Sequence, residues 1–506
     1  MKKEIRLMIR LGIIDIGSNS MRLVIAHIHE YGSFKIIEES KETIGLGKDM
    51  NSKGELNIIR MNKAISALYS FKHLCTYKNV THIIPVATEA VRKASNQTEF
   101  LNRVKNELDM EIRVLSGKEE AYYAYLGTVN SIDFSEGLLV DIGGSSTELI
   151  WVKERYIKES ISLPIGAINL TEKFSLSDSI DKYIESKLIK FILSYYNDVP
   201  WLKNLNNIQL IGIGGSIRNI ARINQKKDNY PLNNLHNYKI KSNEVKEIYE
   251  NIKCKDCNER KKIKGLSKDR ADISLGPMAA LLTLQKFIHS DELCISSNGI
   301  REGLIYEYIL KDKIPLVNVL DFSLNNYISN LHIDKIYVMQ IWTIIQKLYK
   351  GVKSLINASP ENLYKILKTA SLLYNCGINV SYYGRFKHSF YIISNSRING
   401  LSHREQLISS YVAASQGKGT LKIQSDHYGN IINEEDIEII EKLSVLLKIS
   451  RNLHKMTDKN IDKIQCTLLQ KEVIINITVP SKISFRLEDA YDFEKFFNRK
   501  LTLEIQ

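Results

Sequence analysis

The stretch Leu138-Leu139-Val140-Asp141-Ile142-Gly143-Gly144-Ser145-Ser146-Thr147-Glu148 predicts the element around which the chain is organised. An apolar run ends in an aspartate, and paired glycines with small hydroxyl residues then turn the chain into a second strand over residues 148–152. Glycine lacks a Cβ atom, so the backbone at Gly143 and Gly144 can take positive φ and can bring its N–H groups close to an anion. The turn is therefore predicted to bind a phosphate group, and a plain hairpin is the alternative.

The same stretch offers two kinds of oxygen atoms for a charged ligand. The hydroxyl groups of Ser145, Ser146 and Thr147 can join the backbone N–H groups around phosphate oxygens. Asp141 and Glu148 stand at the two edges of the turn and suit a hard divalent cation, which prefers oxygen ligands. The pattern predicts a metal site beside a phosphate site.

A similar design occurs near the start of the chain. An apolar run over residues 11–17 ends in Asp15-Ile16-Gly17, and Ser18-Asn19-Ser20-Met21-Arg22 leads into another apolar run over residues 23–26. One copy of such a hairpin could arise by chance, but two copies with matching flanks favour a common design. They predict a duplicated α/β fold with a cleft between its two halves.

Two predicted helix starts carry candidate site residues. Thr88-Glu89-Ala90-Val91-Arg92 follows a predicted strand over residues 80–86, and a helix N-terminus favours anions, so Arg92 is a candidate phosphate ligand. A Thr N-cap with a solvated arginine is the alternative. In Ser116-Gly117-Lys118-Glu119-Glu120-Ala121, Ser116 and Glu119 have the spacing of a capping box. Glu120 points ~100° away from Glu119 and is our candidate general base; a solvated first-turn carboxylate is the alternative.

A third glycine turn follows the predicted strand over residues 208–213. Gly214-Gly215-Ser216 opens a predicted helix that runs through residue 223. A glycine-rich turn at a helix N-terminus is a common arrangement for binding anions. Gly215 and Ser216 therefore join the predicted phosphate-binding residues.

Composition indicates an ordinary globular chain with a basic surface. The 506 residues contain 70 Lys and Arg against 57 Asp and Glu, which gives a formal net charge of +13 and suggests a polyanionic partner. Basic residues accumulate between Lys253 and Arg270, where they could guide such a polyanion or form a solvated surface. No aromatic motif for stacking bases interleaves with this run, which disfavours nucleic acid as the partner.

The N-terminal sequence does not have the pattern of a signal peptide, and this and the cysteine usage lead us to expect a cytoplasmic protein. Asp15 interrupts the apolar stretch that follows Met1-Lys2-Lys3, and no uncharged run approaches the ~18 residues of a membrane span. Six scattered cysteines do not make a disulfide framework. Cys254 and Cys257 form one Cys-x-x-Cys pair without a second pair at zinc-site spacing, so a chance pair on a loop is the default interpretation.

Beyond about residue 314 the pattern becomes helical. Apolar residues follow helical spacing over residues 338–355 and 363–373, and a strand signal returns only at residues 473–479. We predict four domains: α/β domains at 1–125 and 126–312, a helical domain at 313–446, and a small C-terminal α/β unit at 447–506.

Taken together, these motifs resemble the exopolyphosphatase and guanosine pentaphosphate phosphohydrolase family of the actin-like, sugar-kinase-like superfamily. The motifs that carry the resemblance occur in the family's order: residues 15–20, 88–92, 116–121, 141–148, 214–216, 270–272 and 301–303. The resemblance implies two ribonuclease-H-like α/β domains with the active site between them. It matches Glu120 to the catalytic base, Ser18, Asn19, Arg92 and residues 143–147 to the phosphate loops, and Asp141 and Glu148 to positions near Mg²⁺.

The resemblance also shows two departures. Ser145 stands where many relatives have a third glycine. The helical part looks like the family's HD-like domain, but Tyr374-Asn375 stands where His and an acidic residue often occur, although His388-Ser389 is kept. Tyr and Asn do not replace such a pair as metal ligands. We expect this domain to bind substrate or a partner subunit, without a second hydrolytic site.

The expected function is release of terminal phosphate from inorganic polyphosphate by water, assisted by Mg²⁺ and Glu120. Guanosine pentaphosphate is the alternative substrate, because both compounds end in the same phosphoryl group. A kinase or ATPase on the same fold and a binding protein for polyphosphate or alarmone without turnover are rival interpretations. A monovalent cation such as K⁺ and a homodimer are further expectations from the resemblance.

Overall fold

The computed structural model describes residues 9–29, 32–50, 53–311, 314–357, 360–416, 425–456, 464–477 and 490–505. Met1-Lys2-Lys3, residues 478–479 and the predicted domain boundary at 312–313 lie outside these ranges. The chain divides into two compact units, residues 1–230 with 235–319 and residues 231–234 with 320–506. The finer division into four domains stays a prediction.

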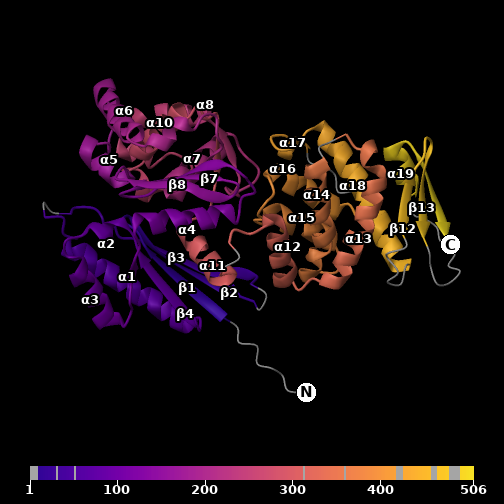
Figure 1. The fold of residues 1–506 in the computed structure, drawn as a ribbon, viewed down its shortest axis with the longest axis horizontal. Helices are drawn as coiled ribbons and strands as arrows, with labels where there is room; N and C mark the ends of the chain where they lie inside the picture. Colours follow the sequence, from indigo (N-terminus) through magenta and orange to yellow (C-terminus); the bar gives the residue numbers. More distant parts are fainter. Residues whose placement is uncertain are drawn as a thin grey trace, which may run out of the picture. The chain divides into compact units, whose positions relative to one another are not determined.

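The first unit begins with a mixed five-stranded sheet in the order β3-β2-β1-β4-β5 (Figure 1). Its strands are β1 (Ile9–Ile16), β2 (Ser20–Ile28), β3 (Phe34–Thr43), β4 (His82–Ala87) and β5 (Arg113–Val114). Its helices are α1 (Ile58–Tyr77), α2 (Glu89–Lys93) and α3 (Gln97–Leu108). Met61, Leu68 and Phe71 of α1 are buried with apolar residues of β1 and β2. β5 contains only two residues and pairs with the end of β4.

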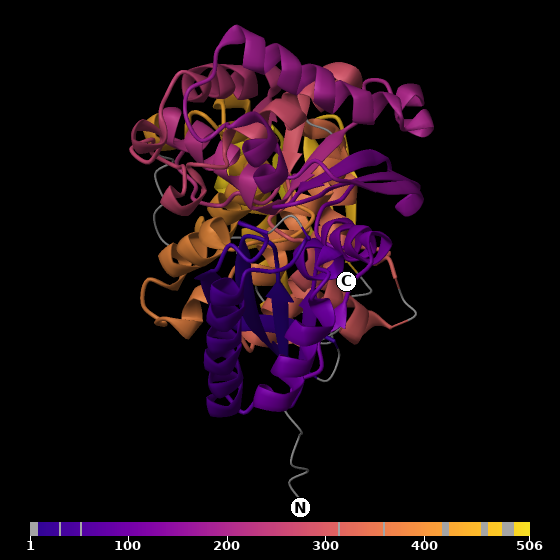
Figure 2. The same cartoon turned by 90° about the vertical axis from the view of Figure 1, so that its left-hand side faces the viewer.

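A second mixed sheet, of six strands in the described residues, has the order β10-β11-β9-β6-β7-β8. Its strands are β6 (Gly137–Ile142), β7 (Thr147–Lys153), β8 (Tyr156–Leu163), β9 (Leu210–Ile213), β10 (Lys239–Lys241) and β11 (Glu292–Ile295). The helices of this half are α5 (Ala167–Phe174), α6 (Lys182–Asn197), α7 (Gly214–Lys227), α8 (Ser242–Lys253), α9 (Cys257–Arg260) and α10 (Leu275–Phe287), with short 3₁₀ turns η1 (Pro200–Asn204) and η2 (Lys268–Arg270). Figure 2 shows the two halves one above the other.

Two helices lie between the sheets: α4 (Gly117–Val129) and α11 (Ile300–Leu310). Their apolar side chains share one buried cluster with residues of both sheets, which joins the two halves. The capping box predicted at the start of α4 is confirmed. The Ser116 Oγ accepts from the Glu119 N–H at 3.2 Å, and the Glu119 carboxylate accepts from the Ser116 N–H at 2.8 Å.

The two hairpins that we compared in the sequence have matching registers. In β1–β2, Asp15 pairs with Arg22, and in β6–β7 Asp141 pairs with Glu148. In each sheet the strand carrying the aspartate also pairs in parallel with another strand, β4 or β9. The duplicated α/β fold is therefore confirmed, and each half presents its turn at the end of a buried strand.

The second unit is helical with a small sheet. Its helices are α12 (Val319–Asn330), α13 (Lys335–Val352), α14 (Pro360–Leu373), α15 (Arg385–Asn395), α16 (His403–Ala414), α17 (Ser425–Tyr428), α18 (Glu434–Met456) and α19 (Ala490–Phe497), with η3 (Lys353–Leu355) and η4 (Cys376–Asn379). The sheet has the order β12-β13-β14, with β12 (Ile464–Leu468), β13 (Glu472–Ile477) and β14 (Lys500–Ile505). One apolar cluster runs through helices and sheet.

Candidate active site

A cleft in the first unit brings the predicted hairpin turns together. Residues from both halves line it, and they include Asp15, Ser18, Asn19, Glu89, Glu120, Asp141, Gly143, Gly144, Ser145, Ser146, Glu148 and Gly215. The two turns approach each other directly, because a Cβ atom added to Gly144 would lie 2.9 Å from the Ser18 Cβ and 3.5 Å from the Asn19 nitrogen. Most of the predicted phosphate-binding residues are thus placed around one site.

The glycines of the central turn have a different role from the one we predicted. Neither Gly143 nor Gly144 has positive φ, so the turn does not use the backbone freedom that glycine allows there. Gly143 closes the turn through its N–H, which donates to the Ser146 carbonyl at 2.9 Å. Gly144 is needed for space, since a side chain there would collide with Ser18 of the other hairpin. It is Gly214, at the start of α7, that takes positive φ, at 90°.

The hydroxyl residues divide into those that face the cleft and those that do not. Ser145 and Ser146 line it. Thr147 is fully buried and its Oγ1 donates to the Ile165 carbonyl at 2.6 Å, so this hydroxyl supports the turn. The Ser216 Oγ accepts from the Arg270 guanidinium at 3.3 Å, and Ser216 does not line the cleft. The structure therefore does not place Thr147 and Ser216 among the residues that can reach a ligand.

Asp141 and Glu148 face each other across β6 and β7, where Glu148 is buried and Asp141 is half-buried. Burial raises the pKa of Asp141 to about 6 and the pKa of Glu148 well above its usual value, and the charge of Glu120 adds to the shift of Glu148. The Glu148 Oε1 accepts from the Ser162 hydroxyl at 2.8 Å. Buried carboxylates of this kind need a cation or a proton.

The donor set fits Mg²⁺. In the part of the chain that the structure describes, no group of three or more His, Cys, Asp or Glu residues is arranged to hold a metal. Mg²⁺ usually takes only one or two protein carboxylates and completes its octahedron with water and substrate phosphate oxygens. Asp141 and Glu148, beside the turn that we predicted to bind phosphate, provide that number.

Glu120 lies at the start of α4 and lines the cleft, with only 4% of its surface exposed. Burial raises its pKa to about 7, although a hydrogen bond from Arg92 opposes the shift. The Arg92 guanidinium donates to this carboxylate and, at 2.5 Å, to the Leu115 carbonyl. Arg92 does not line the cleft. Glu120 thus has the burial and basicity of a general base, and Arg92 is paired with it.

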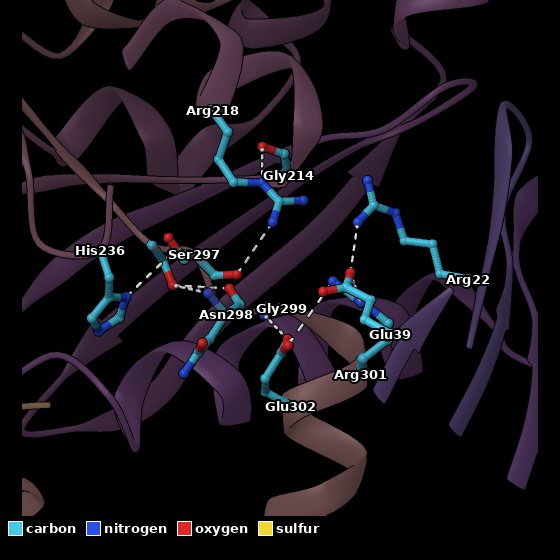
Figure 3. A network of polar contacts seen from close by, with 11 residues as sticks. Arg22, Glu39, Gly214, Arg218, His236, Ser297, Asn298, Gly299, Arg301 and Glu302 are labelled. Carbon is cyan, nitrogen blue, oxygen red and sulfur yellow. Dashed lines mark hydrogen bonds and ion pairs between the residues drawn. The ribbon is translucent and has the colours of Figure 1, made fainter. Parts of the chain in front are cut away.

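Four arginines line the cleft: Arg22, Arg218, Arg270 and Arg301. From the sequence, only Arg270, at the end of the basic run, has a candidate role, and the other three have none. Figure 3 shows Arg22 and Arg301 on either side of Glu39. The Glu39 Oε1 accepts from Arg22 at 3.1 Å and from Arg301 at 2.8 Å. An arginine inside a buried strand, as at Arg22, is a signal that could have marked this group.

Arg218 is half-buried in the lining of the cleft. Burial, together with the charges of Arg301 and Arg22, lowers its pKa to about 9. Its hydrogen bonds go to two backbone carbonyls, of Gly214 at 3.2 Å and Ser297 at 3.4 Å (Figure 3). A guanidinium held by neutral partners among other arginines favours an anionic ligand.

The basic run predicted to guide a polyanion contributes only Arg270 to the cleft, although all of residues 253–270 are described. Arg260 is fully buried and donates to the carbonyls of Leu176 and Asp178, each at 2.7 Å. Arg260 is therefore a structural residue of its half.

The carboxyl groups of the cleft predict how stability depends on pH. Asp15, Glu120, Asp141 and Glu148 all have raised pKa values because of burial. The folded chain therefore binds more protons than the unfolded chain above about pH 4, and the stabilisation by these protons is lost as pH rises through about 6 to 7. We expect the melting temperature in EDTA to fall by several degrees between pH 5.5 and pH 8. Mg²⁺ should restore the melting temperature at pH 8. A melting temperature that does not change with pH would contradict the raised pKa values of these carboxyl groups.

Comparison with known proteins shows the family of the chain. The sequence profile of the Ppx/GppA phosphatase family matches residues 24–312, and that of domain III of the same phosphatases matches residues 320–490. A guanosine-5'-triphosphate,3'-diphosphate pyrophosphatase of Vibrio parahaemolyticus is 25% identical over 450 residues, which are 87% of each chain. A bifunctional 3-dehydroquinate synthase/phosphatase of Fusobacterium nucleatum is 31% identical over 308 residues, and the chain spans 46% of its length.

Solved structures give the same result for the first unit. The Aquifex aeolicus member of the Ppx/GppA family is 31% identical, with a TM-score of 0.53, and the match covers 60% of this chain and 99% of that one. An exopolyphosphatase from Cytophaga hutchinsonii is 25% identical, with a TM-score of 0.55, over 59% and 97% of the two chains.

The fold and the site define an actin-like phosphoanhydride hydrolase. The chain belongs to the Ppx/GppA phosphatase family, whose profile matches more than half of it. Among the described residues, no helix is both long and apolar enough to cross a membrane.

Proposed function

We propose that the protein is an exopolyphosphatase, which releases the terminal phosphoryl group of inorganic polyphosphate as orthophosphate. Phosphoryl transfer to water depends on positioning and charge neutralisation more than on covalent chemistry. The two facing turns, with Ser18, Asn19, Gly143, Gly144 and Ser145, would hold the terminal phosphate through N–H and hydroxyl groups. Bound Mg²⁺ on Asp141 and Glu148 would neutralise charge on the phosphate oxygens.

Glu120 would remove a proton from the attacking water. The water oxygen forms a bond to the terminal phosphorus, and the bond from that phosphorus to the bridging oxygen breaks. Arg92, which donates to Glu120 in this structure, would hold this carboxylate in position beside the attacking water.

The observation that carries polyphosphate as the substrate is the composition of the cleft wall. Four arginines line it, and the described lining residues include no aromatic side chain. Arginines bind further phosphate groups, whereas a guanine base usually stacks on an aromatic ring. The cleft therefore suits a chain of phosphates better than a nucleoside.

Guanosine pentaphosphate is the second candidate substrate. The relatives that match 87% of this chain are named for hydrolysis of this nucleotide, and the matched region includes most of the second unit. We propose that the second unit is HD-like and binds substrate or a partner subunit in a homodimer, that K⁺ could accompany Mg²⁺, and that the protein acts in the cytoplasm.

The test is phosphate release by the purified full-length chain with Mg²⁺, on long-chain polyphosphate and guanosine pentaphosphate side by side. We expect a higher kcat/KM on polyphosphate. Release from the nucleotide alone would overturn the polyphosphate assignment in favour of the second candidate. Replacing Arg218 by methionine should raise KM for polyphosphate at least ~10-fold, because a positively charged ligand of the phosphate chain is lost from the cleft.

A further inference from the structure

Glu89 is a buried carboxylate in the cleft that the reaction described above does not use. It is the first residue of α2, lines the cleft, and has 3% of its surface exposed. Its Oε1 is paired with the ammonium group of Lys93, but its Oε2 is buried without a hydrogen-bond partner. A buried carboxylate oxygen is costly unless something donates to it, so a ligand or water in the cleft is the expected donor.

The fold brings this oxygen to the same region as Glu120. Glu89 and Arg92 are three residues apart on α2 and therefore lie on one side of the helix. Arg92 donates to Glu120, and both glutamates line the cleft. The negative charge of Glu89 also helps burial to raise the pKa of Glu120, as expected for two neighbouring carboxylates.

We propose that Glu89 is a second catalytic carboxylate, which accepts a hydrogen bond from the attacking water at Oε2. This role rests on the proposed hydrolysis with Glu120 as the base. The water gives one proton to Glu120 while its other O–H donates to Glu89. Its lone pair is thereby directed at the terminal phosphorus, the new P–O bond forms, and the bridging P–O bond breaks with its electrons on the departing phosphate chain. Two acceptors fix the orientation of the water, where one would leave it free to rotate.

The test is the Glu89→Gln substitution, which keeps the size of the side chain. Lys93 would attract the amide carbonyl, so the NH₂ group would face the cleft and the acceptor would be lost. We expect kcat to fall at least tenfold with KM unchanged within about twofold, measured on whichever phosphoanhydride the wild type cleaves. Lys93→Met is the matched control, since it removes the ion pair but keeps Oε2, and its kcat should stay within about threefold of the wild type.

Several outcomes would overturn the role. If Glu89→Gln has a normal kcat, Glu89 only supports the fold through Lys93. If its kcat returns to normal at high Mg²⁺, Glu89 binds a cation instead of water.

The double variant Glu89→Gln/Glu120→Gln should lose little kcat beyond the loss in Glu120→Gln alone, because both residues act on one water. Full activity of Glu120→Gln would instead reject the proposed base, and the comparison of the two substrates tests the substrate separately.

Discussion

Replacing Glu120 by glutamine is expected to lower kcat by ~10²- to 10⁴-fold while the protein folds normally. General-base assistance typically contributes a factor of that size, and the amide cannot accept the proton of the attacking water. Burial already raises the pKa of Glu120 to about 7, so the neutral amide should be accepted at least as well as the carboxylate at pH 8. We therefore expect a melting temperature equal to or above that of the wild type.

The measurement is steady-state phosphate release together with thermal unfolding. Glu119→Gln is the matched control, because Glu119 is the neighbouring carboxylate and caps α4 without lining the cleft. Hydrogen bonds from Ser116 lower the pKa of Glu119 to about 2, so this variant should lose stability and keep most of its kcat. Equal losses of kcat in both variants would show that the helix start matters and that Glu120 has no special role.

Local signals were sufficient to predict the elements that carry the site. The two hairpins, the capping box at Ser116 and the glycine turn before α7 each depend on a few consecutive residues, and the structure has all of them. The duplication could be predicted because the spacing between paired residues is the same, from Asp15 to Arg22 and from Asp141 to Glu148. Short pairings such as β5 and the exact helix ends depend on neighbours that the local sequence does not contain.

The four arginines that line the cleft could not be predicted from local signals in the same way. They come from four separate segments, in β2, α7, η2 and α11, and only Arg22, inside a buried strand, stands out in its own segment. Only tertiary packing brings them beside the carboxylates of Asp15, Glu39 and Asp141. The roles of Thr147 and Gly144 were also beyond local reasoning, because they depend on contacts with Ile165 and with the other hairpin.

Substituting Gly303 by alanine is expected to cause the largest loss of stability, ~3 kcal/mol or more, together with a loss of activity. Gly303 lies on α11 where this helix crosses α4, and an added Cβ atom would collide with the Tyr123 carbonyl and lie 2.8 Å from its carbon. Backbone cannot move aside as a flexible side chain can, so the helices must separate, and overpacking alone costs ~1–3 kcal/mol. Glu120 lies on α4 and Arg301 on α11. Separation of these helices would therefore also move Glu120, the proposed general base, away from Arg301.

The measurement is unfolding by urea together with phosphate release. Gly127→Ala tests the same crossing from the other helix, since its Cβ atom would collide with the Gly299 carbonyl. Gly54→Ala is the control: its φ of 73° is unfavourable for alanine but no atom lies within 4 Å, so it should lose only ~1 kcal/mol and keep its activity. If Gly303→Ala and Gly127→Ala are no less stable than this control, the close contact of α4 with α11 does not stabilise the fold. If they are unstable but fully active per folded molecule, the crossing supports the fold without positioning Glu120.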